Sequence, residues 1–336
     1  MKLRVGLNPY GLTYHLGLQG RGTPRANPRP AGLEGFLALC SELGAETVEL
    51  WEGWLTPMSA PELAALRARL GGRMPVVSSG LERGDLVRLF ELAEALEAPL
   101  LRFALTGVLC GDRATSDPPW PERVRGVREK LARAAEMAER AGRTVVIENH
   151  QDFTSDELVG LCEQFGPAVR IVYDTGNSFP VGEAPLDFTR AIAPYVRYVH
   201  LKDYRVQRTD EGIRLVRCAI GDGAVPFAGL LDCLAAHHAE LPAVLEPGAL
   251  EARHVRFFTE GWWQGYPPRE ARALVRCLAA TLPQALAAHE DYRTPWERGE
   301  DHALEAYELD MIRRSAANMR ALGIMKEGSG GAGSQG

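Results

Sequence analysis

The sequence predicts a (β/α)8 barrel, in which eight parallel strands close into a cylinder that helices surround. Short apolar runs alternate along the chain with segments of helical spacing. Four late apolar runs each stop on a side chain that can ligate a metal, as expected where parallel strands end at one rim. An open doubly wound sheet is disfavoured, because no Gly-x-Gly-x-x-Gly motif follows the first strand and an open sheet would spread these four strand ends apart.

The strands are expected where short apolar runs are bounded by turn residues. These runs cover residues 3–7, 47–50, 75–77, 100–105, 144–147, 171–173, 198–199 and 243–245. A long loop rich in Gly, Pro and Arg, residues 9–30, follows the first strand. Loops of this length are typically functional or mobile.

The helices are expected where apolar residues recur every three or four positions and capping residues flank the run. Gly44 closes the first helix, Ser59 and Pro61 begin the second, and Gly142 ends the long helix. The expected helices cover residues 32–43, 61–70, 83–97, 121–141, 156–165, 185–193, 228–240 and 268–288.

Three further segments fall outside this repeat. An excursion around residues 205–226 lengthens the last strand-to-strand interval, and residues 301–322 are expected to form an extra C-terminal helix outside the barrel. Residues 1–325 are expected to form a single barrel domain, since such barrels commonly take a whole chain of this size. Residues 326–336, which are rich in Gly and Ser, are expected to be a flexible tail.

Composition excludes several classes of function. A net charge of −6 argues against a nucleic-acid groove, which would need a basic face. No apolar run of about 18 residues could span a bilayer, and the first residues lack the apolar region of a signal peptide, so we expect a cytoplasmic protein. The six cysteines are scattered without a Cys-x-x-Cys pair, which favours reduced thiols.

The four strand ends carry Glu148, Asp174, His200 and Glu246. Any one of them alone would most often cap a helix or form an ion pair at the barrel mouth. Four side chains of ligand type in four consecutive units favour a site for one divalent metal ion. Three carboxylates and one imidazole suit Mn²⁺ best, with Mg²⁺, Co²⁺ and Zn²⁺ as alternatives and Fe²⁺ also compatible.

Five short motifs resemble the sugar phosphate isomerase/epimerase family of the xylose isomerase-like TIM barrel superfamily. They are IENH at 147–150, YDTGN at 173–177, HLKD at 200–203, GDG at 221–223 and LEP at 245–247. The resemblance implies that Glu148, Asp174, His200 and Glu246 hold one divalent metal. It also implies an isomerase or epimerase of carbohydrate metabolism that acts on a keto sugar, polyol or sugar acid.

The chemistry expected of such a site is proton abstraction next to a carbonyl through a metal-stabilised ene-diolate. Glu148 and Glu246 are the candidate catalytic carboxylates, because they would approach the substrate from opposite sides of the metal. If a leaving group lies one carbon away, the same chemistry gives a lyase: a dehydratase, a decarboxylase or an enzyme that cleaves a C–X bond. A non-catalytic barrel subunit is a further alternative, although it would be expected to have lost a ligand.

The sequence departs from the family at two points. Asn177 stands where ketose 3-epimerases carry a substrate-contacting histidine, and Arg205 is only an approximate match to their arginine after the metal histidine. Both remain candidate substrate-binding residues, and the change at Asn177 favours the lyase alternative. Endonuclease IV, in the same superfamily, needs several more histidines, so a DNA-repair function is disfavoured.

Three other polar residues lie at or near strand ends. His150, two residues past Glu148, is a candidate base or a loop histidine bonded to a backbone carbonyl. Lys202 is a candidate catalytic cation or an ion-pair partner of Asp203. Arg102, inside an apolar strand, is expected to pair with a carboxylate such as Glu148, or to bind an anionic group of the substrate.

Aromatic residues follow two of the strands. Trp51 comes after the second strand, and Trp262 lies in the segment TEGWWQGYPP at 259–268. Both are candidates to stack on a sugar ring at the barrel mouth. The aromatic segment is also compatible with a contact between copies of a homo-oligomer or with packing on the extra helix. No Gly-rich phosphate loop stands out, so the expected partner is a small carbohydrate whose phosphorylation the sequence leaves open, without nucleic acid or membrane.

Overall fold

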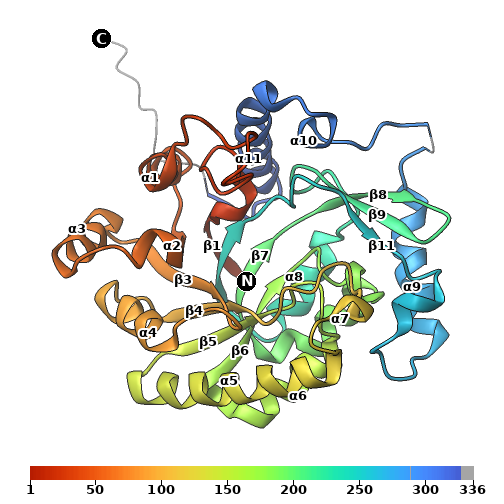
Figure 1. Cartoon of the computed structure of the whole chain (residues 1–336), viewed down its shortest axis with the longest axis horizontal. Helices are drawn as coiled ribbons and strands as arrows, with labels where there is room; N and C mark the ends of the chain where they lie inside the picture. The colour runs from red at the N-terminus through yellow and green to blue at the C-terminus, as the bar shows by residue number, and fades with distance from the viewer. Residues whose placement is uncertain (288, 327–336) are drawn as a thin grey trace.

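Eight parallel strands close into a barrel in this computed structural model, which describes residues 1–287 and 289–326 (Figure 1). Neighbouring strands follow the order β1-β10-β7-β6-β5-β4-β3-β2. The predicted (β/α)8 barrel is therefore confirmed. The strands are β1 (Lys2–Leu7), β2 (Thr47–Trp51), β3 (Met74–Gly80), β4 (Leu100–Ala104), β5 (Thr144–Glu148), β6 (Val169–Asp174), β7 (Val196–Leu201) and β10 (Glu240–Leu245).

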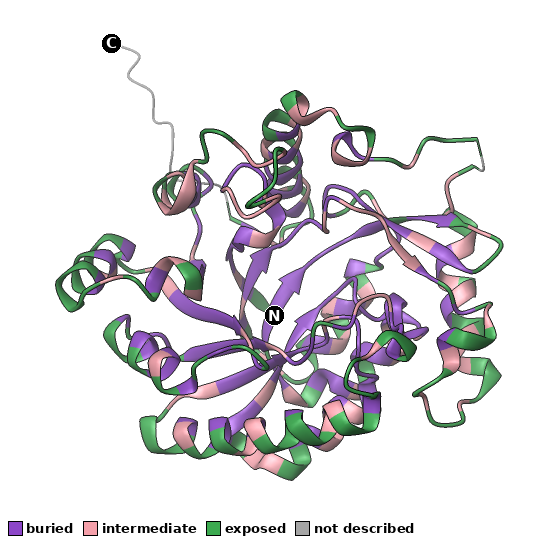
Figure 2. Cartoon of the chain, viewed as in Figure 1, coloured by how far each residue is buried: buried purple, intermediate pink, exposed green. Residues whose placement is uncertain are grey.

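One layer of apolar side chains from six strands packs inside the barrel. Its members are all buried: Val76, Leu100, Val146, Val172, Tyr198 and Val244. A second and larger core lies between the strands and the surrounding helices. Figure 2 shows this arrangement, with buried strands at the centre and helices exposed along their outer faces. The apolar runs of the sequence are thus buried on both faces, as a parallel barrel requires.

Helices follow the strands around the outside. They are α1 (Gly32–Glu42), α2 (Glu52–Leu55), α3 (Ala60–Leu70), α4 (Leu86–Ala95), α5 (Trp120–Ala141), α6 (Ser155–Phe165), α7 (Pro185–Ile192), α8 (Phe227–Ala235), α9 (Ala271–Thr281), α10 (Pro295–Arg298) and α11 (Leu304–Ala321). The expected caps are present, because Ser59 forms a capping box with Glu62 before α3 and Gly142 ends α5 with a φ of 61°.

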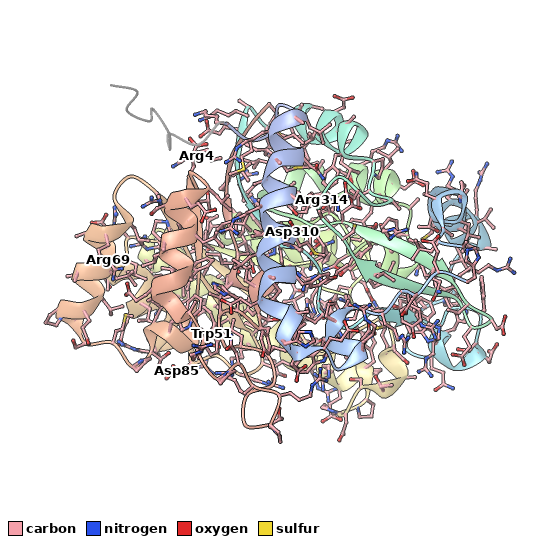
Figure 3. The ribbon with its side chains drawn as sticks, turned by 90° about the horizontal axis from the view of Figure 1, so that it is seen from above. Arg4, Trp51, Arg69, Asp85, Asp310 and Arg314 are labelled. Carbon is pink, nitrogen blue, oxygen red and sulfur yellow. The ribbon has the colours of Figure 1, made fainter. Side chains whose placement is uncertain are left out.

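Two helices exchange the positions that the sequence predicted for them. The helix expected to end the barrel, α9, buries only Cys277 and Thr281 and reaches α7 through an ion pair between Arg276 and Asp187. The helix expected outside the repeat, α11, contacts β10 and carries the more extensive buried face. Figure 3 shows α11 beside α1. The prediction assigned α9 to the barrel because it is the first helix after the last barrel strand. The chain instead first crosses the barrel mouth to the loop after β4, and only then returns to β10 as α11.

The predicted excursion forms a small sheet of its own. Antiparallel strands β8 (Tyr204–Arg208) and β9 (Ile213–Arg217) pair with each other, and β11 (Arg253–Val255) adds to β9. The loop after β10 supplies β11, so this sheet joins segments that follow the seventh and eighth strands of the barrel. It lies on the β7 and β10 side of the barrel (Figure 1).

The last helix-to-strand boundary of the barrel differs from the prediction. The helix expected over 228–240 is shorter, because α8 ends at Ala235 and the eighth barrel strand already begins at Glu240. The predicted flexible tail, 326–336, lies outside the described residues except for Lys326. Among the helices described, none combines the length and the apolar character needed to cross a membrane.

Candidate functional site

Strand parity brings the four predicted ligand residues to one place. Val146, Val172, Tyr198 and Val244 point into the barrel. Because side chains on one face of a strand recur every two residues, the next inward positions are Glu148, Asp174, His200 and Glu246. All four lie at the carboxyl ends of their strands. Figure 3 indicates this end of the barrel by Trp51, the last residue of β2, which lies opposite Arg4 near the start of β1.

The four side chains can each offer one ligand atom, and these atoms lie within 4.8 Å of one another. Three of the converging atoms have no hydrogen-bond partner among the described residues: Glu148 Oε1, His200 Nδ1 and Glu246 Oε2. His200 Nδ1 lies 2.8 Å from Glu246 Oε2, but the two atoms are not aligned as a hydrogen bond. An unpaired buried polar atom costs roughly 1–3 kcal/mol. A cation among these atoms would satisfy all three, so the residues present fit a divalent metal ion.

Glu49, on β2, is a part of this site that the sequence analysis missed. Its Oε2 lies 2.8 Å from His200 Nε2 and accepts a hydrogen bond of 2.8 Å from the Tyr198 hydroxyl. A carboxylate on the far ring nitrogen orients a ligand histidine toward the metal. The signal was available, because Glu49 is a charged residue between Val48 and Leu50 in a buried strand.

Charge determines the protonation of His200. Burial lowers its pKa, but the carboxylates of Glu49 and Glu246 outweigh burial and raise the pKa to about 9. Without a cation, His200 is therefore an imidazolium at neutral pH. A metal ion at Nδ1 would have to displace that proton, so its affinity would increase with pH.

Lys202 and Arg102 are the counter-ions of the cluster. Lys202 Nζ lies 2.5 Å from Asp174 Oδ2 and 2.7 Å from Glu246 Oε1. Burial raises the pKa of Glu246, but Lys202 and His200 outweigh burial and hold that pKa well below its usual range. Arg102 donates to Glu148 Oε2, so the expected pairing of Arg102 is confirmed.

The alternative pairing of Lys202 with Asp203 is wrong. The carboxylate of Asp203 instead accepts backbone N–H groups from Tyr204, Gly221, Gly223 and Val225. These bonds fasten the GDG loop to the end of β7. Lys202 therefore pairs with Asp174 and Glu246 of the metal-ligand cluster and not with Asp203.

A cavity of about 330 Å³ opens onto the cluster. Its wall includes Arg102, His150, Lys202 and Glu246 from the strand ends, Tyr10 and Thr13 from the first long loop, and Arg253 from β11. One predicted ligand, Glu246, and both counter-ions, Arg102 and Lys202, thus face the same space as His150. Of the four ligand residues, Glu246 lines the cavity, so a small molecule there would contact its carboxylate directly.

His150 lies in the cavity wall as a neutral imidazole. Its Nδ1 is buried and has no hydrogen-bond partner among the described residues, so the expected bond to a backbone carbonyl is not made there. Burial, with smaller effects from Arg102 and Lys202, lowers the pKa of His150 to about 3. A neutral ring with an unpaired nitrogen suits a hydrogen bond to a substrate.

Asn177 and Arg205 lie outside the wall of this cavity. Asn177 is buried, and its Nδ2 donates 2.7 Å to Asp174 Oδ2, so in this structure it positions a ligand rather than facing the cavity. Arg205 pairs with Glu290 at 3.1 Å on the small sheet and is about half exposed. The geometry does not support a direct substrate contact for either residue. A match to the family pattern fixes the position of a residue in the sequence, but it does not fix the direction of its side chain.

Trp51 and Trp262 are also absent from this wall. The guanidinium of Arg21 lies 4.7 Å from the centre of the Trp51 ring. Trp262 is buried, donates its Nε1 to the Cys110 carbonyl at 2.8 Å and stacks on Tyr266. The aromatic segment therefore packs on the loop after β4, and neither ring is presented to a sugar in this cavity.

The comparisons with known proteins agree with this fold. The family model for the xylose isomerase-like TIM barrel matches residues 37–260. The uncharacterized protein YihM of Escherichia coli (strain K12) is 31% identical over 105 residues, which are 31% of this chain and 32% of that protein. The chain thus matches only about a third of the length of this relative.

Two solved structures show similarity of fold alone, because their sequences are at most 16% identical to this chain. D-psicose 3-epimerase from Clostridium cellulolyticum H10, solved with D-tagatose, aligns over 97% of this chain and 100% of its own, with a TM-score of 0.58 and 16% identity. The probable 3-DHS dehydratase AsbF from Bacillus anthracis aligns over 73% and 92%, with a TM-score of 0.50 and 15% identity. On the family match, the chain belongs to the xylose isomerase-like TIM barrel family.

Proposed function

We propose that this member of the xylose isomerase-like TIM barrel family is a divalent-metal-dependent isomerase or epimerase. Its substrate would be a small carbohydrate: a keto sugar, polyol or sugar acid. The observation that carries the proposal is the convergence of unpartnered Glu148 Oε1, His200 Nδ1 and Glu246 Oε2 beside Asp174, at a cavity of about 330 Å³. The fold shared with a D-psicose 3-epimerase supports the carbohydrate class.

Glu148, Asp174, His200 and Glu246 would hold the ion, which we take to be Mn²⁺, with Mg²⁺, Co²⁺ or Zn²⁺ as alternatives. A divalent cation bound there would supply Lewis-acid polarisation of a substrate carbonyl. Glu49 would keep His200 in the ligating orientation, and Asn177 would do the same for Asp174.

Glu246 and Glu148 would carry the proton next to the carbonyl. Glu246 is kept ionised by Lys202 and His200, so it can accept a proton at neutral pH. Glu148 is held on its other side by Arg102, which fixes the direction of its free Oε1. A change of configuration at carbon requires an ionised carboxylate that accepts the proton on one face and a protonated carboxyl that donates a proton on the other. Glu246 would be the acceptor, and Glu148 would be the donor once it has taken up a proton.

A lyase is the second candidate, and the placement of His150 favours it. His150 and Lys202 both line the cavity, the first as a neutral imidazole and the second as an ammonium group. Elimination needs one group to accept the proton and another to protonate the leaving group. These two residues would provide that pair without using either glutamate as the acid.

The test is product analysis in D₂O. Mn²⁺-loaded protein is incubated with a panel of keto sugars, inososes and keto sugar acids, and products are read by NMR and mass spectrometry. We expect deuterium at the carbon next to the carbonyl in a product of unchanged heavy-atom composition. Loss of water or carbon dioxide would instead establish the lyase. Metal binding without exchange on any compound would favour a non-catalytic barrel subunit.

A further inference from the structure

We propose that the substrate carries a carboxylate, bound by Arg253 at the rim of the cavity, so that the substrate class is a polyhydroxy acid. This inference rests on the proposed function, because it concerns the same cavity. It narrows the substrate from carbohydrates in general to sugar acids. No residue of the family motifs in this sequence suggests it.

Arg253 is the one cavity-lining cation whose charge has no partner within residues 1–287 and 289–326. Three cations line the cavity: Arg102, Lys202 and Arg253. Arg102 pairs with Glu148, and Lys202 pairs with Asp174 and Glu246. No ion pair within 4.0 Å involves Arg253 among the described residues, and its Nε is buried without a hydrogen-bond partner. A partly buried guanidinium in this state suits an anion supplied by a ligand.

The small sheet holds Arg253 in place. Arg253 opposes Leu215 in the antiparallel pairing of β11 with β9. Its neighbour His254 lies on the other face of the strand and approaches Thr209 at 2.9 Å, and Arg256 pairs with Asp112. The basic residues around Arg253 are therefore used in structural contacts, whereas Arg253 itself is presented to the cavity.

Polar groups beside Arg253 fit a carboxylate. Gln151 also lines the cavity and accepts the Cys110 N–H with its Oε1, which leaves its NH₂ group as a donor. Glu251 also lines the cavity, and its Oε1 accepts a hydrogen bond of 3.0 Å from Gln19. A planar guanidinium matches a carboxylate through two parallel hydrogen bonds.

A phosphate is the other anion with this chemistry. Phosphate sites commonly combine several backbone N–H groups of a Gly-rich loop or a helix N-terminus with a cation. The described wall of the cavity offers a single free cation and side-chain donors. The carboxylate is therefore the better match.

The test is ligand binding by calorimetry to the Mn²⁺-loaded full chain, with matched non-reacting probes. Gluconate carries the carboxylate, glucitol lacks it, and glucitol 6-phosphate carries the phosphate. We expect wild type to bind gluconate roughly 10- to 100-fold more tightly than glucitol, from one charge-assisted contact. Arg253→Gln should lose this preference while its affinity for glucitol and for Mn²⁺ stays unchanged. Arg253→Lys should keep part of it.

Arg208→Gln is the control, because Arg208 is an exposed residue of β8 in the same small sheet and lies outside the cavity wall, so its binding should equal that of wild type. Equal or absent binding of gluconate and glucitol by wild type would overturn the proposal. An unchanged preference for gluconate over glucitol in Arg253→Gln would also overturn it. Tighter binding of glucitol 6-phosphate than of gluconate by wild type would overturn the carboxylate assignment. These readouts are independent of turnover, so a failed exchange experiment would leave them interpretable.

Discussion

A different carboxylate lies near each ring nitrogen of His200, and the one placed to hydrogen-bond is Glu49, at Nε2. Glu49 lies 2.8 Å from Nε2, and Glu246 lies 2.8 Å from Nδ1 on the side where Glu148 and Asp174 gather. The ring is therefore oriented before any ion binds. This makes Glu49 a positioning residue for the proposed metal site.

Glu49→Gln should weaken Mn²⁺ binding by roughly 10- to 100-fold, since the outer carboxylate orients the ligand ring and raises its basicity. Titration of Mn²⁺ by calorimetry measures the change. Glu308→Gln is the matched control, because Glu308 is equally buried and pairs with Arg217 away from the cluster. An affinity that is unchanged in Glu49→Gln, or lowered equally in both variants, would contradict this role.

Asp152 supplies a pH prediction away from the ligands. Burial raises its pKa from the usual 3.8 to about 6, against the hydrogen bonds from Thr106 and Phe153. A carboxyl with a raised folded pKa stabilises the fold below its unfolded pKa, and this contribution is lost as the pH rises through the folded pKa. Relative to Asp152→Asn, wild type should lose up to roughly 3 kcal/mol between about pH 4 and pH 7.

Urea unfolding of both proteins at the two pH values measures that difference, in which the other titrations cancel. Asp210→Asn, at an exposed turn between β8 and β9, serves as the control and should follow wild type. A parallel pH dependence of wild type and Asp152→Asn would show that Asp152 titrates normally.

Site residues could be predicted from the sequence only where they lie at the end of an apolar strand. Glu148, Asp174 and His200 each follow an apolar run, and parity alone places them on one face. Glu49 was missed because it lies inside its strand rather than at the end. Arg253 was missed because its position depends on a pairing between β9 and β11 that no local pattern encodes.

At the scale of elements, α11 and not α9 covers the last barrel strand. Ile312 of α11 is fully buried, whereas Val275 of α9 is 60% exposed. Ile312→Ala should therefore destabilise the fold by about 2–5 kcal/mol, through lost transfer energy and a cavity. Val275→Ala should change the unfolding free energy by less than about 0.5 kcal/mol. Urea unfolding of both variants checks this, and similar losses would contradict the assignment of the two helices.

The presence of each strand and helix was predictable, because the spacing of apolar residues is local to each element and capping residues flank the helices. Gly142 and the capping box at Ser59 are local signals that the structure confirms. The order in which α9 and α11 pack is a long-range property, since it depends on where the chain returns after crossing the barrel mouth. The exposed face of α9 could not be read from its helical spacing alone.

At the scale of the whole molecule, metal binding should be linked to folding. The ligands come from four separate strands of one closed barrel, so unfolding disperses them. Mn²⁺ at about 100 times its dissociation constant should add about 2.7 kcal/mol to the stability of wild type. Thermal unfolding with EDTA or Mn²⁺ measures this as a rise in Tm. Glu246→Gln should show a smaller rise, and an equal rise in both proteins would place the ion elsewhere.

The most direct test of metal-dependent proton transfer is solvent exchange on a single substrate from the panel. Deuterium incorporation next to the carbonyl is followed in D₂O for untreated protein, for protein stripped with EDTA, and after Mn²⁺ is added back. We expect exchange to stop on stripping and to return with Mn²⁺, and Glu246→Gln to be inactive while remaining folded. Exchange that persists without metal, or near-wild-type exchange by Glu246→Gln, would contradict the account.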